Sequence, residues 1–125
     1  MIEFTARNHP ENKSVRVITI SGKLDEDSCD YFFGWIEDQI QAGHRQLILD
    51  CSGLEHINSM GLGLLIRAHS RMKKHMGNVK IAALQSFVAE AFRIVGFDKI
   101  LHLYESVDRA QKAFPKHQAS VAATA

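Results

Sequence analysis

Residues 47–65 read Leu-Ile-Leu-Asp-Cys-Ser-Gly-Leu-Glu-His-Ile-Asn-Ser-Met-Gly-Leu-Gly-Leu-Leu. The stretch begins with an apolar run typical of a buried strand, passes through a polar turn, and enters the periodic apolar pattern of an amphipathic helix. We expect the strand to span 46–50 and the helix to begin at about Ser59. A strand that leads directly into a helix is the repeating unit of α/β proteins.

The rest of the chain repeats this alternation. Further strands are expected at 2–7, 15–20, 79–84 and 100–104, and further helices are expected to begin near residues 25, 86 and 106. The order predicts an α/β fold with a central, mostly parallel sheet of about five strands and about four helices. The first strand is expected at an edge, where it can pair antiparallel. Residues 1–115 are predicted to form this single domain, and residues 116–125 a mobile C-terminal tail.

Local signals set the expected limits of these elements. Ser21-Gly22 is expected to end the second strand, and the acids Asp25 to Asp27 are expected to start the first helix, which should end near Gly43. Ser86 is expected to cap the third helix, and Ser106 with Asp108 to open the last. In the second helix, a shared apolar face is expected from Leu62, Leu65, Ile66, Met72 and Met76, with Gly77 as the C-terminal stop.

The composition is that of an ordinary globular protein. The chain has 125 residues, 46% of them apolar, and a formal net charge of +1, which gives no global attraction to nucleic acid or to an anionic membrane. No segment approaches the ~20 apolar residues that cross a bilayer, and the N-terminus lacks the pattern of a signal peptide. Cys29 and Cys51 are interpreted as reduced thiols, although a bridge between them stays open. We therefore expect a cytoplasmic protein.

Three patterns could indicate catalysis. Gly61-Leu62-Gly63 resembles part of a nucleotide loop, but Ile66 stands where a dinucleotide fingerprint needs glycine, and close approach of the helix to a neighbour is the better interpretation. Asp50 ends a strand like a phospho-accepting aspartate, yet no further acids accompany it for Mg²⁺, so it is expected to bond backbone groups in the following turn. The seven histidines show no zinc-type spacing, and His69 is expected to be packed. No enzyme, cofactor or metal site is predicted.

Two surface features have two interpretations each. The outward face of the second helix carries Arg67, Arg71 and Lys74, which form either a solvated face or a contact for an acidic partner. Tyr31 and Trp35 lie away from the apolar side of the first helix, where they form an exposed aromatic patch or are partly buried.

Ser59 is the candidate with the most specific chemistry. Asn and Ser are favoured N-cap residues, so either Asn58 or Ser59 can cap the second helix. If Asn58 caps it, the Ser59 hydroxyl is free in the first turn, where the helix dipole favours added negative charge. Phosphorylation there would add roughly −1.5 to −2 charges to the surface without unfolding the domain.

The residues 47–65 resemble the central signature of STAS domains, and in particular the bacterial anti-sigma factor antagonists of the sporulation and general-stress type. The resemblance continues through residues 77–82, 92–100 and 104–110, so it covers nearly the whole chain. The chain differs from the family pattern around the acceptor serine, where the family usually has Asp before it and often Ser or Thr after it. This chain has Asn58 and Met60 at those positions.

The resemblance implies a partner-switching regulator. In that family the unphosphorylated protein binds an anti-sigma factor that is also a serine kinase, and this binding frees the sigma factor. The kinase phosphorylates the serine that matches Ser59 and breaks the complex, and a PP2C-type phosphatase restores binding. No direct contact with nucleic acid or membrane is implied. The residues expected to contact the partner are Asn58, Ser59, Met60, Gly61, Leu62, Gly63, Leu64 and Arg67.

Two alternatives remain open. The chain can be a non-switching STAS scaffold or an accessory subunit of a signalling or lipid-transport complex, with Ser59 acting only as a cap. A nucleotide sensor that uses Gly61-Leu62-Gly63 is the third class, and it predicts measurable GTP or ATP binding.

Overall fold

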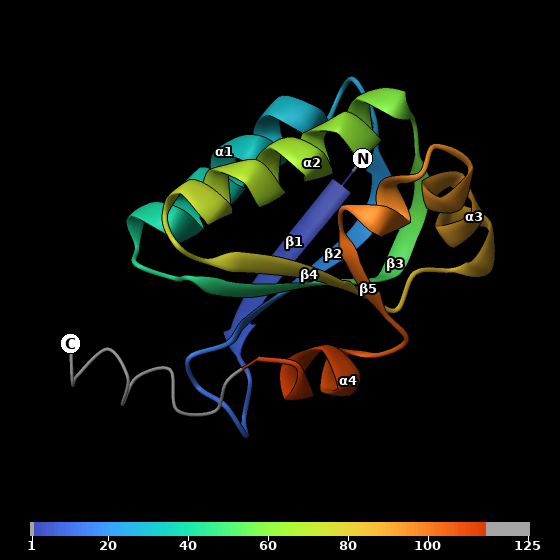
Figure 1. Cartoon of the computed structure of the whole chain (residues 1–125). Coiled ribbons are helices and arrows are strands. Elements are labelled where there is room, and N and C mark those ends of the chain that lie inside the picture. Colours follow the sequence, from blue (N-terminus) through green and yellow to red (C-terminus); the bar gives the residue numbers. More distant parts are fainter. Residues whose placement is uncertain (1, 115–125) are drawn as a thin grey trace.

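The computed structural model describes residues 2–114, which form one five-stranded sheet with helices on both faces (Figure 1). The strands are β1 (Ile2–Asn8), β2 (Arg16–Leu24), β3 (Gln46–Ile57), β4 (Asn78–Ala82) and β5 (His102–Tyr104), which lie in this order across the sheet. β1 pairs antiparallel with β2, and all other pairs are parallel. The predicted α/β class, the mostly parallel sheet and the antiparallel edge strand are confirmed.

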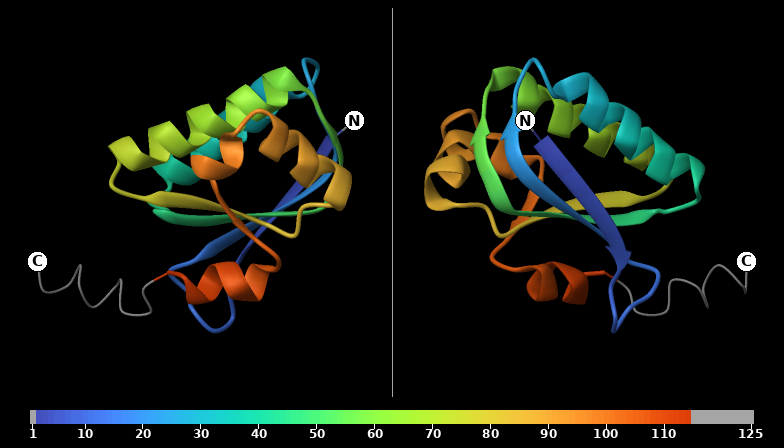
Figure 2. Two further views of the ribbon diagram at one scale, coloured as in Figure 1. Left: turned by 45° about the vertical axis from the view of Figure 1, so that its right-hand side comes forward. Right: turned by 180° about the vertical axis from the view of Figure 1, so that it is seen from behind.

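The helices are α1 (Cys29–Gln41), α2 (Ser59–Lys74), α3 (Ser86–Ile94), the 3₁₀ turn η1 (Phe97–Lys99) and α4 (Val107–Lys112). α1 and α2 lie side by side on one face of the sheet, and α4 covers the other (Figures 1 and 2). α3 contacts β3, whose carboxyl end leads into α2. The expected tail, 116–125, lies outside the described residues, as does Pro115.

The core has two layers, one on each face of the sheet. The larger layer lies under α1, α2 and α3, and includes Ile20, Phe32, Leu49, Leu65 and Phe92. The smaller layer lies against α4 and includes Val17, Ile48, Ala82, Ala110 and Phe114. β3 is apolar on successive residues because, as expected for a central parallel strand, both of its faces are covered.

β2 and β3 extend well past their predicted ends. The structure continues β2 to Leu24 and β3 to Ile57, so the predicted polar turn after Asp50 is wrong for most of its length. The two extensions pair with each other, Ser21 opposite Gly53, across an irregular register. A Cβ atom at Gly53 would lie 2.7 Å from Ser21 Oγ and 2.9 Å from the Ile20 carbonyl oxygen. Gly53 therefore allows the backbones of β2 and β3 to approach each other closely. In the sequence alone, the same glycine suggested the end of a strand.

Several helix limits also differ from prediction. Asp25 to Asp27 form a turn before α1, because Ser28 Oγ donates to the Lys23 carbonyl and the Asp27 N–H donates to Asp25 Oδ1. Gln85, and not Ser86, is the N-cap residue of α3, and it makes no side-chain cap bond. The predicted cap of α4 is confirmed, since Ser106 Oγ accepts a 3.1 Å hydrogen bond from the Arg109 N–H.

The end of α2 corrects another expectation. Met76 is 92% exposed, so it does not share the apolar face of α2, and its φ of +63° places it in the left-handed region. Gly77 was predicted to end the helix, but α2 ends at Lys74, and Gly77 is needed for close packing instead. A Cβ atom there would collide with the Arg45 carbonyl oxygen and would also lie 2.5 Å from Met72 Sδ, so the close approach of this backbone to the entry of β3 needs glycine.

Candidate functional site

The site forms where β3 enters α2. Asn58 is the N-cap residue: its Oδ1 accepts a 3.0 Å hydrogen bond from the Gly61 N–H, and its carbonyl oxygen accepts the first helical bond, from Leu62. The other end of the same amide donates from Nδ2 to Glu26 Oε2 at 2.6 Å. Of the two cap candidates, Asn58 therefore serves, and it is fixed from both sides.

Ser59 is left free by this arrangement. It is exposed in the first turn of α2, and its Oγ has no hydrogen-bond partner among residues 2–114. The N–H groups of Ser59 and Met60 also lack acceptors within this part of the chain, because Asn58 takes up only those of Gly61 and Leu62. Free N–H groups at a helix N-terminus favour an anionic oxygen placed next to them.

The two glycines of this turn have different surroundings. A Cβ atom at Gly61 would lie 2.5 Å from the Leu24 carbonyl oxygen and 2.7 Å from Ile57 Cγ1, so α2 approaches the ends of β2 and β3 closely only because residue 61 is glycine. A Cβ atom at Gly63 would meet nothing within 4 Å. The close-approach interpretation is confirmed for Gly61, whereas Gly63 opens on to the surface.

The predicted contact residues thus divide into two groups. Ser59, Met60 and Arg67 are exposed, and Asn58 and Gly63 are partly exposed. Leu62 and Leu64 are buried in the core, 5% and 4% exposed, and Gly61 is buried as well. Leu62 and Leu64 therefore point into the core of this structure, and the exposed part of the predicted contact surface is formed by Ser59, Met60 and Arg67.

Arg67 and Arg71 are held by α1. The Arg67 guanidinium lies over the Phe33 ring, 4.3 Å from its centroid, and Arg71 binds Glu37 through Nε–Oε1 at 2.6 Å and Nη2–Oε2 at 2.8 Å. The hydrogen bond from Arg71 lowers the pKa of the Glu37 carboxyl below its ordinary value. Part of the basic face predicted for α2 is therefore an interhelical contact.

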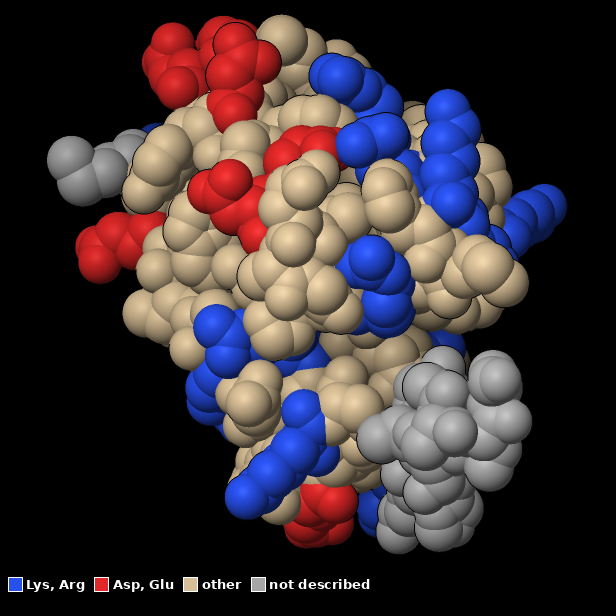
Figure 3. Space-filling view, turned by 90° about the vertical axis from the view of Figure 1, so that its left-hand side faces the viewer, with Lys and Arg blue, Asp and Glu red and all other residues tan. Residues whose placement is uncertain are grey.

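The two helices carry opposite charges. α1 contains Asp30, Glu37 and Asp38 without a basic residue, and α2 contains Arg67, Arg71, Lys73 and Lys74 without an acidic one. Figure 3 shows the acidic and the basic side chains gathered on separate sides of the upper surface. The exposed stripe of α2 beyond Ser59 is consequently basic.

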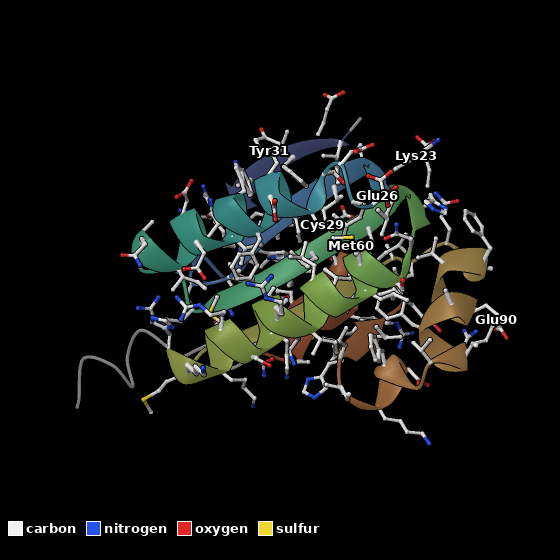
Figure 4. All side chains as sticks on the ribbon, turned by 90° about the horizontal axis from the view of Figure 1, so that it is seen from above. Lys23, Glu26, Cys29, Tyr31, Met60 and Glu90 are labelled. Atoms are coloured by element: carbon white, nitrogen blue, oxygen red, sulfur yellow. The ribbon has the colours of Figure 1, made fainter. Side chains whose placement is uncertain are left out.

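Two features at this edge of the sheet escape sequence reasoning. The sequence presents Glu26 only as a helix-starting acid, and its contact with Asn58 joins residues 32 positions apart, which no local pattern reveals. The side chain of Phe87 in α3 is 60% exposed, an exposed fraction similar to the 56% of Met60. Figure 4 shows Met60 at the start of α2, with Glu26 and Lys23 at the same end of the molecule and α3, marked by Glu90, further to the right. An exposed aromatic residue early in an amphipathic helix was the available signal.

Three aromatic residues of α1 pack against β1. Phe4 contacts Tyr31, Phe32 and Trp35, with ring centroids 5.5, 4.9 and 5.5 Å apart. Trp35 is partly buried and Tyr31 remains 61% exposed. Of the two interpretations, partial burial therefore holds for Trp35 and exposure for Tyr31.

The other sequence candidates have structural roles. Asp50 Oδ1 accepts a 3.1 Å hydrogen bond from the Ser52 N–H, as predicted. Cys29 and Cys51 are free and buried, and burial raises the pKa of both thiols. His69 is buried, as expected. Within residues 2–114 no group of three or more His, Cys, Asp or Glu side chains is placed to hold a metal ion.

The fold agrees with the family comparison. The model of the STAS domain family matches residues 6–110. The chain belongs to the STAS domain family. The predicted resemblance is confirmed over nearly the whole described range.

Relatives of this STAS domain include regulators of sigma factors. BtrV of Bordetella bronchiseptica, whose name as an anti-sigma factor antagonist is provisional, is 24% identical over 98 residues, which are 78% of this chain and 84% of BtrV. An anti-sigma factor antagonist from Mycobacterium paratuberculosis has a TM-score of 0.79 at 23% identity, over 90% of this chain and 93% of that one. The chain is thus an STAS domain similar to anti-sigma factor antagonists.

Two further solved structures extend the range of similarity. The Bacillus cell fate determinant SpoIIAA in its phosphorylated form has a TM-score of 0.65 at 17% identity, over 88% of this chain and 97% of that one. A sulfate transporter family protein from Wolinella succinogenes has a TM-score of 0.68 at 19% identity, over 78% and 81%. These two show the fold alone. No helix among residues 2–114 of this STAS domain is long and apolar enough to cross a membrane.

Proposed function

We propose that this chain is a cytoplasmic anti-sigma factor antagonist, not an enzyme, whose binding to an anti-sigma factor is switched off by phosphorylation of Ser59. The observation that carries the proposal is the free, exposed Ser59 hydroxyl beside a helix N-terminus that Asn58 already caps. Because the cap does not depend on Ser59, a phosphoryl group can be added without loss of the helix start. The names of BtrV and of the mycobacterial protein support the class of partner.

The proposed docking surface is the exposed stripe of α2, Ser59, Met60, Gly63 and Arg67, with the exposed Phe87 of α3, a helix that follows the same edge of the sheet. Met60 and Phe87 offer apolar anchors, and Gly63 lets a partner approach the helix backbone closely. Arg67, ordered by its stacking on Phe33, offers a cation for an acidic residue of the anti-sigma factor. These contacts combine an apolar centre with a charged rim, as protein interfaces commonly do.

Phosphorylation would act on the partner and not on the fold. A phosphoryl group on Ser59 would lie at the positive end of α2, near two N–H groups without acceptors among the described residues, which stabilises it within the free domain. In the complex the same dianion would be pressed into a desolvated interface, which costs several kcal/mol without a cationic partner. A loss of roughly a hundredfold or more in affinity follows. A kinase activity of the anti-sigma factor and a PP2C-type phosphatase would supply the two directions of the switch.

The test uses purified full-length chain with its cognate anti-sigma factor. After incubation with this kinase and ATP, phosphosite mass spectrometry should place the phosphate on Ser59, and calorimetry should show at least the hundredfold loss in affinity. Ser59→Asp should weaken binding, and Ser59→Ala should bind but resist inactivation by ATP. Ser70, exposed on the same helix, provides the matched controls Ser70→Asp and Ser70→Ala. Equal affinity of the Ser59 variants would reject the proposal.

A non-switching scaffold is the second candidate, because the solved similar structures include a sulfate transporter family protein. In that case Ser59→Asp and Ser70→Asp would have the same small effect on partner binding, and no kinase-dependent phosphate would be found on Ser59. The nucleotide-sensor alternative has less support, because Asn58 already occupies the N–H of Gly61 and that of Leu62.

A further inference from the structure

A second polar site lies at the opposite end of the sheet from Ser59. β3 and β4 begin there with Gln46 and Asn78, whereas Ser59 follows the carboxyl end of β3. A cavity of about 220 Å³ opens at these strand starts, lined among others by Arg45, Gln46, Asn78 and Lys80. No acidic residue lines it within the described part of the chain.

Lys80 is the unusual member of this lining. It lies in β4 between Val79 and Ile81 and is only 5% exposed. Its Nζ lies 3.3 Å from Tyr104 Oη, 3.5 Å from His102 Nδ1, and 4.8 Å from the centroid of the Phe114 ring. These neighbours are hydroxyl, imidazole and aromatic groups. They stabilise an ammonium group without neutralising its charge.

A carboxylate partner for Lys80 is missing from residues 2–114. None of the four ion pairs within this range involves Lys80. A buried cation is ordinarily paired with an anion because removal of its hydration shell is costly. The positive charge of Lys80 is therefore available to a bound anion.

The neighbouring groups favour the same ligand. Arg45 Nη1 donates to the carbonyl oxygens of Ile40 and His44, which fixes the guanidinium at the cavity and leaves further N–H donors of the fork. Burial and the nearby charge of Lys80 lower the pKa of His102, so its imidazole is neutral near pH 7. A neutral imidazole does not itself need an acidic partner at this site. Lysine as a point charge and arginine as a fork are the usual pair for phosphate oxygens.

The size of the cavity suits a small ligand. Its 220 Å³ exceeds several times the ~30 Å³ share of one water in the liquid, but lies below the ~300 Å³ at which sites for drug-sized ligands begin. We propose that this cavity binds a small oxyanion, phosphate or the phosphate group of a metabolite, between Lys80 and Arg45. The site is independent of the proposed switch, because it does not involve α2 near Ser59.

The test is a titration of the ¹⁵N-labelled full chain with inorganic phosphate, with ionic strength held constant by sodium chloride. Saturable amide shifts are expected at Gly77, Asn78 and Lys80, and acetate should bind at least tenfold more weakly. A second titration with glucose 6-phosphate distinguishes free phosphate from the phosphate group of a metabolite. If glucose 6-phosphate binds more tightly than inorganic phosphate, the ligand is a phosphorylated metabolite; if it binds more weakly, the ligand is free phosphate.

Lys80→Met keeps the apolar stem, removes the charge, and should weaken phosphate binding at least tenfold. Lys99→Met, at an exposed lysine of η1, is the matched control and should leave the affinity unchanged. Arg45→Gln should weaken binding by at least threefold, which keeps the proposal testable if Lys80→Met misfolds. Shifts that do not saturate, that spread over the lysines and arginines of α2, or that persist in Lys80→Met and Arg45→Gln would overturn the site.

Discussion

Asn58 Nδ2 donates a 2.6 Å hydrogen bond to Glu26 Oε2, while Asn58 Oδ1 caps α2 at the Gly61 N–H. One amide therefore joins the loop before α1 to the start of α2, directly beside Ser59. An aspartate at position 58, the usual residue of the family pattern, would still cap the helix but would meet Glu26 with a like charge. Asn58 and Glu26 are thus a matched pair.

Asn58→Asp should lower the free energy of unfolding by roughly 1 kcal/mol at pH 7, because it replaces a hydrogen bond to a carboxylate with a repulsion at an exposed site. Urea unfolding measures the change. Glu26→Gln in the same chain should recover most of the loss, since a glutamine amide can donate to the introduced carboxylate. If Asn58→Asp alone were as stable as the parent chain, the hydrogen bond from Asn58 to Glu26 would contribute nothing to stability.

The two glycines at the start of α2 should respond oppositely to alanine. Gly61→Ala places Cβ 2.5 Å from the Leu24 carbonyl oxygen, so it should destabilise the fold by about 2 kcal/mol or more. Gly63→Ala meets no atom within 4 Å and should stabilise the helix by up to about 1 kcal/mol. Thermal unfolding of the two variants provides the comparison. Similar effects at both positions would contradict the packing described for Gly61.

A substitution at Gly63 can test the docking of a partner without affecting the folding of the domain. Gly63→Gln should leave the domain folded, because the position opens on to the surface, and should weaken binding of the proposed anti-sigma factor by tenfold or more. Calorimetry with the cognate partner measures the affinity. Gly34→Gln, at an exposed glycine of α1 whose added Cβ also meets nothing within 4 Å, is the control and should bind normally.

Met76 holds a left-handed conformation, φ +63°, with its side chain almost fully exposed. Met76→Gly should raise the free energy of unfolding by about 1 kcal/mol, since a left-handed conformation costs a side-chain-bearing residue roughly that amount. Gly77→Ala, one residue later, should destabilise instead, because its Cβ would collide with the backbone carbonyl oxygen of Arg45. Chemical denaturation of both variants tests the contrast.

His69 should make stability depend on pH. Its pKa is lowered by burial and by the nearby charge of Lys73, with His102 contributing, and its Nδ1 is buried without a partner among the described residues. Between pH 6.5, the ordinary value, and the lower folded pKa, the unfolded chain binds the proton more readily. Stability should therefore fall as the pH drops below about 6.5. His69→Leu should reduce this slope in urea unfolding at roughly pH 7.5, 6.5 and 5.5, and an unchanged slope would exclude His69 as its source.

The family signature and the hydrophobic periods determined the architecture of this protein from its sequence. The runs at 46–50 and 79–84, and the periodic pattern after Ser59, are local signals, and each element begins within one residue of its predicted start, although β3 continues to Ile57. The antiparallel first strand also followed from its position before the alternating units. Such features depend on neighbours within a few residues, which a sequence displays directly.

Only the tertiary structure decided which side chains are available at the site. Leu62 and Leu64 lie in the same motif as Ser59, yet the packing of α2 on the sheet buries them and exposes Met60 and Arg67. Ser21-Gly22 and Ser52-Gly53 look like strand ends until their pairing shows that two backbones come together there. The contact of Asn58 with Glu26 and the buried, unneutralised Lys80 likewise arise from segments far apart in the chain. Burial and long-range contacts are properties of the packed chain, so the sequence could name Ser59 but could not show what surrounds it.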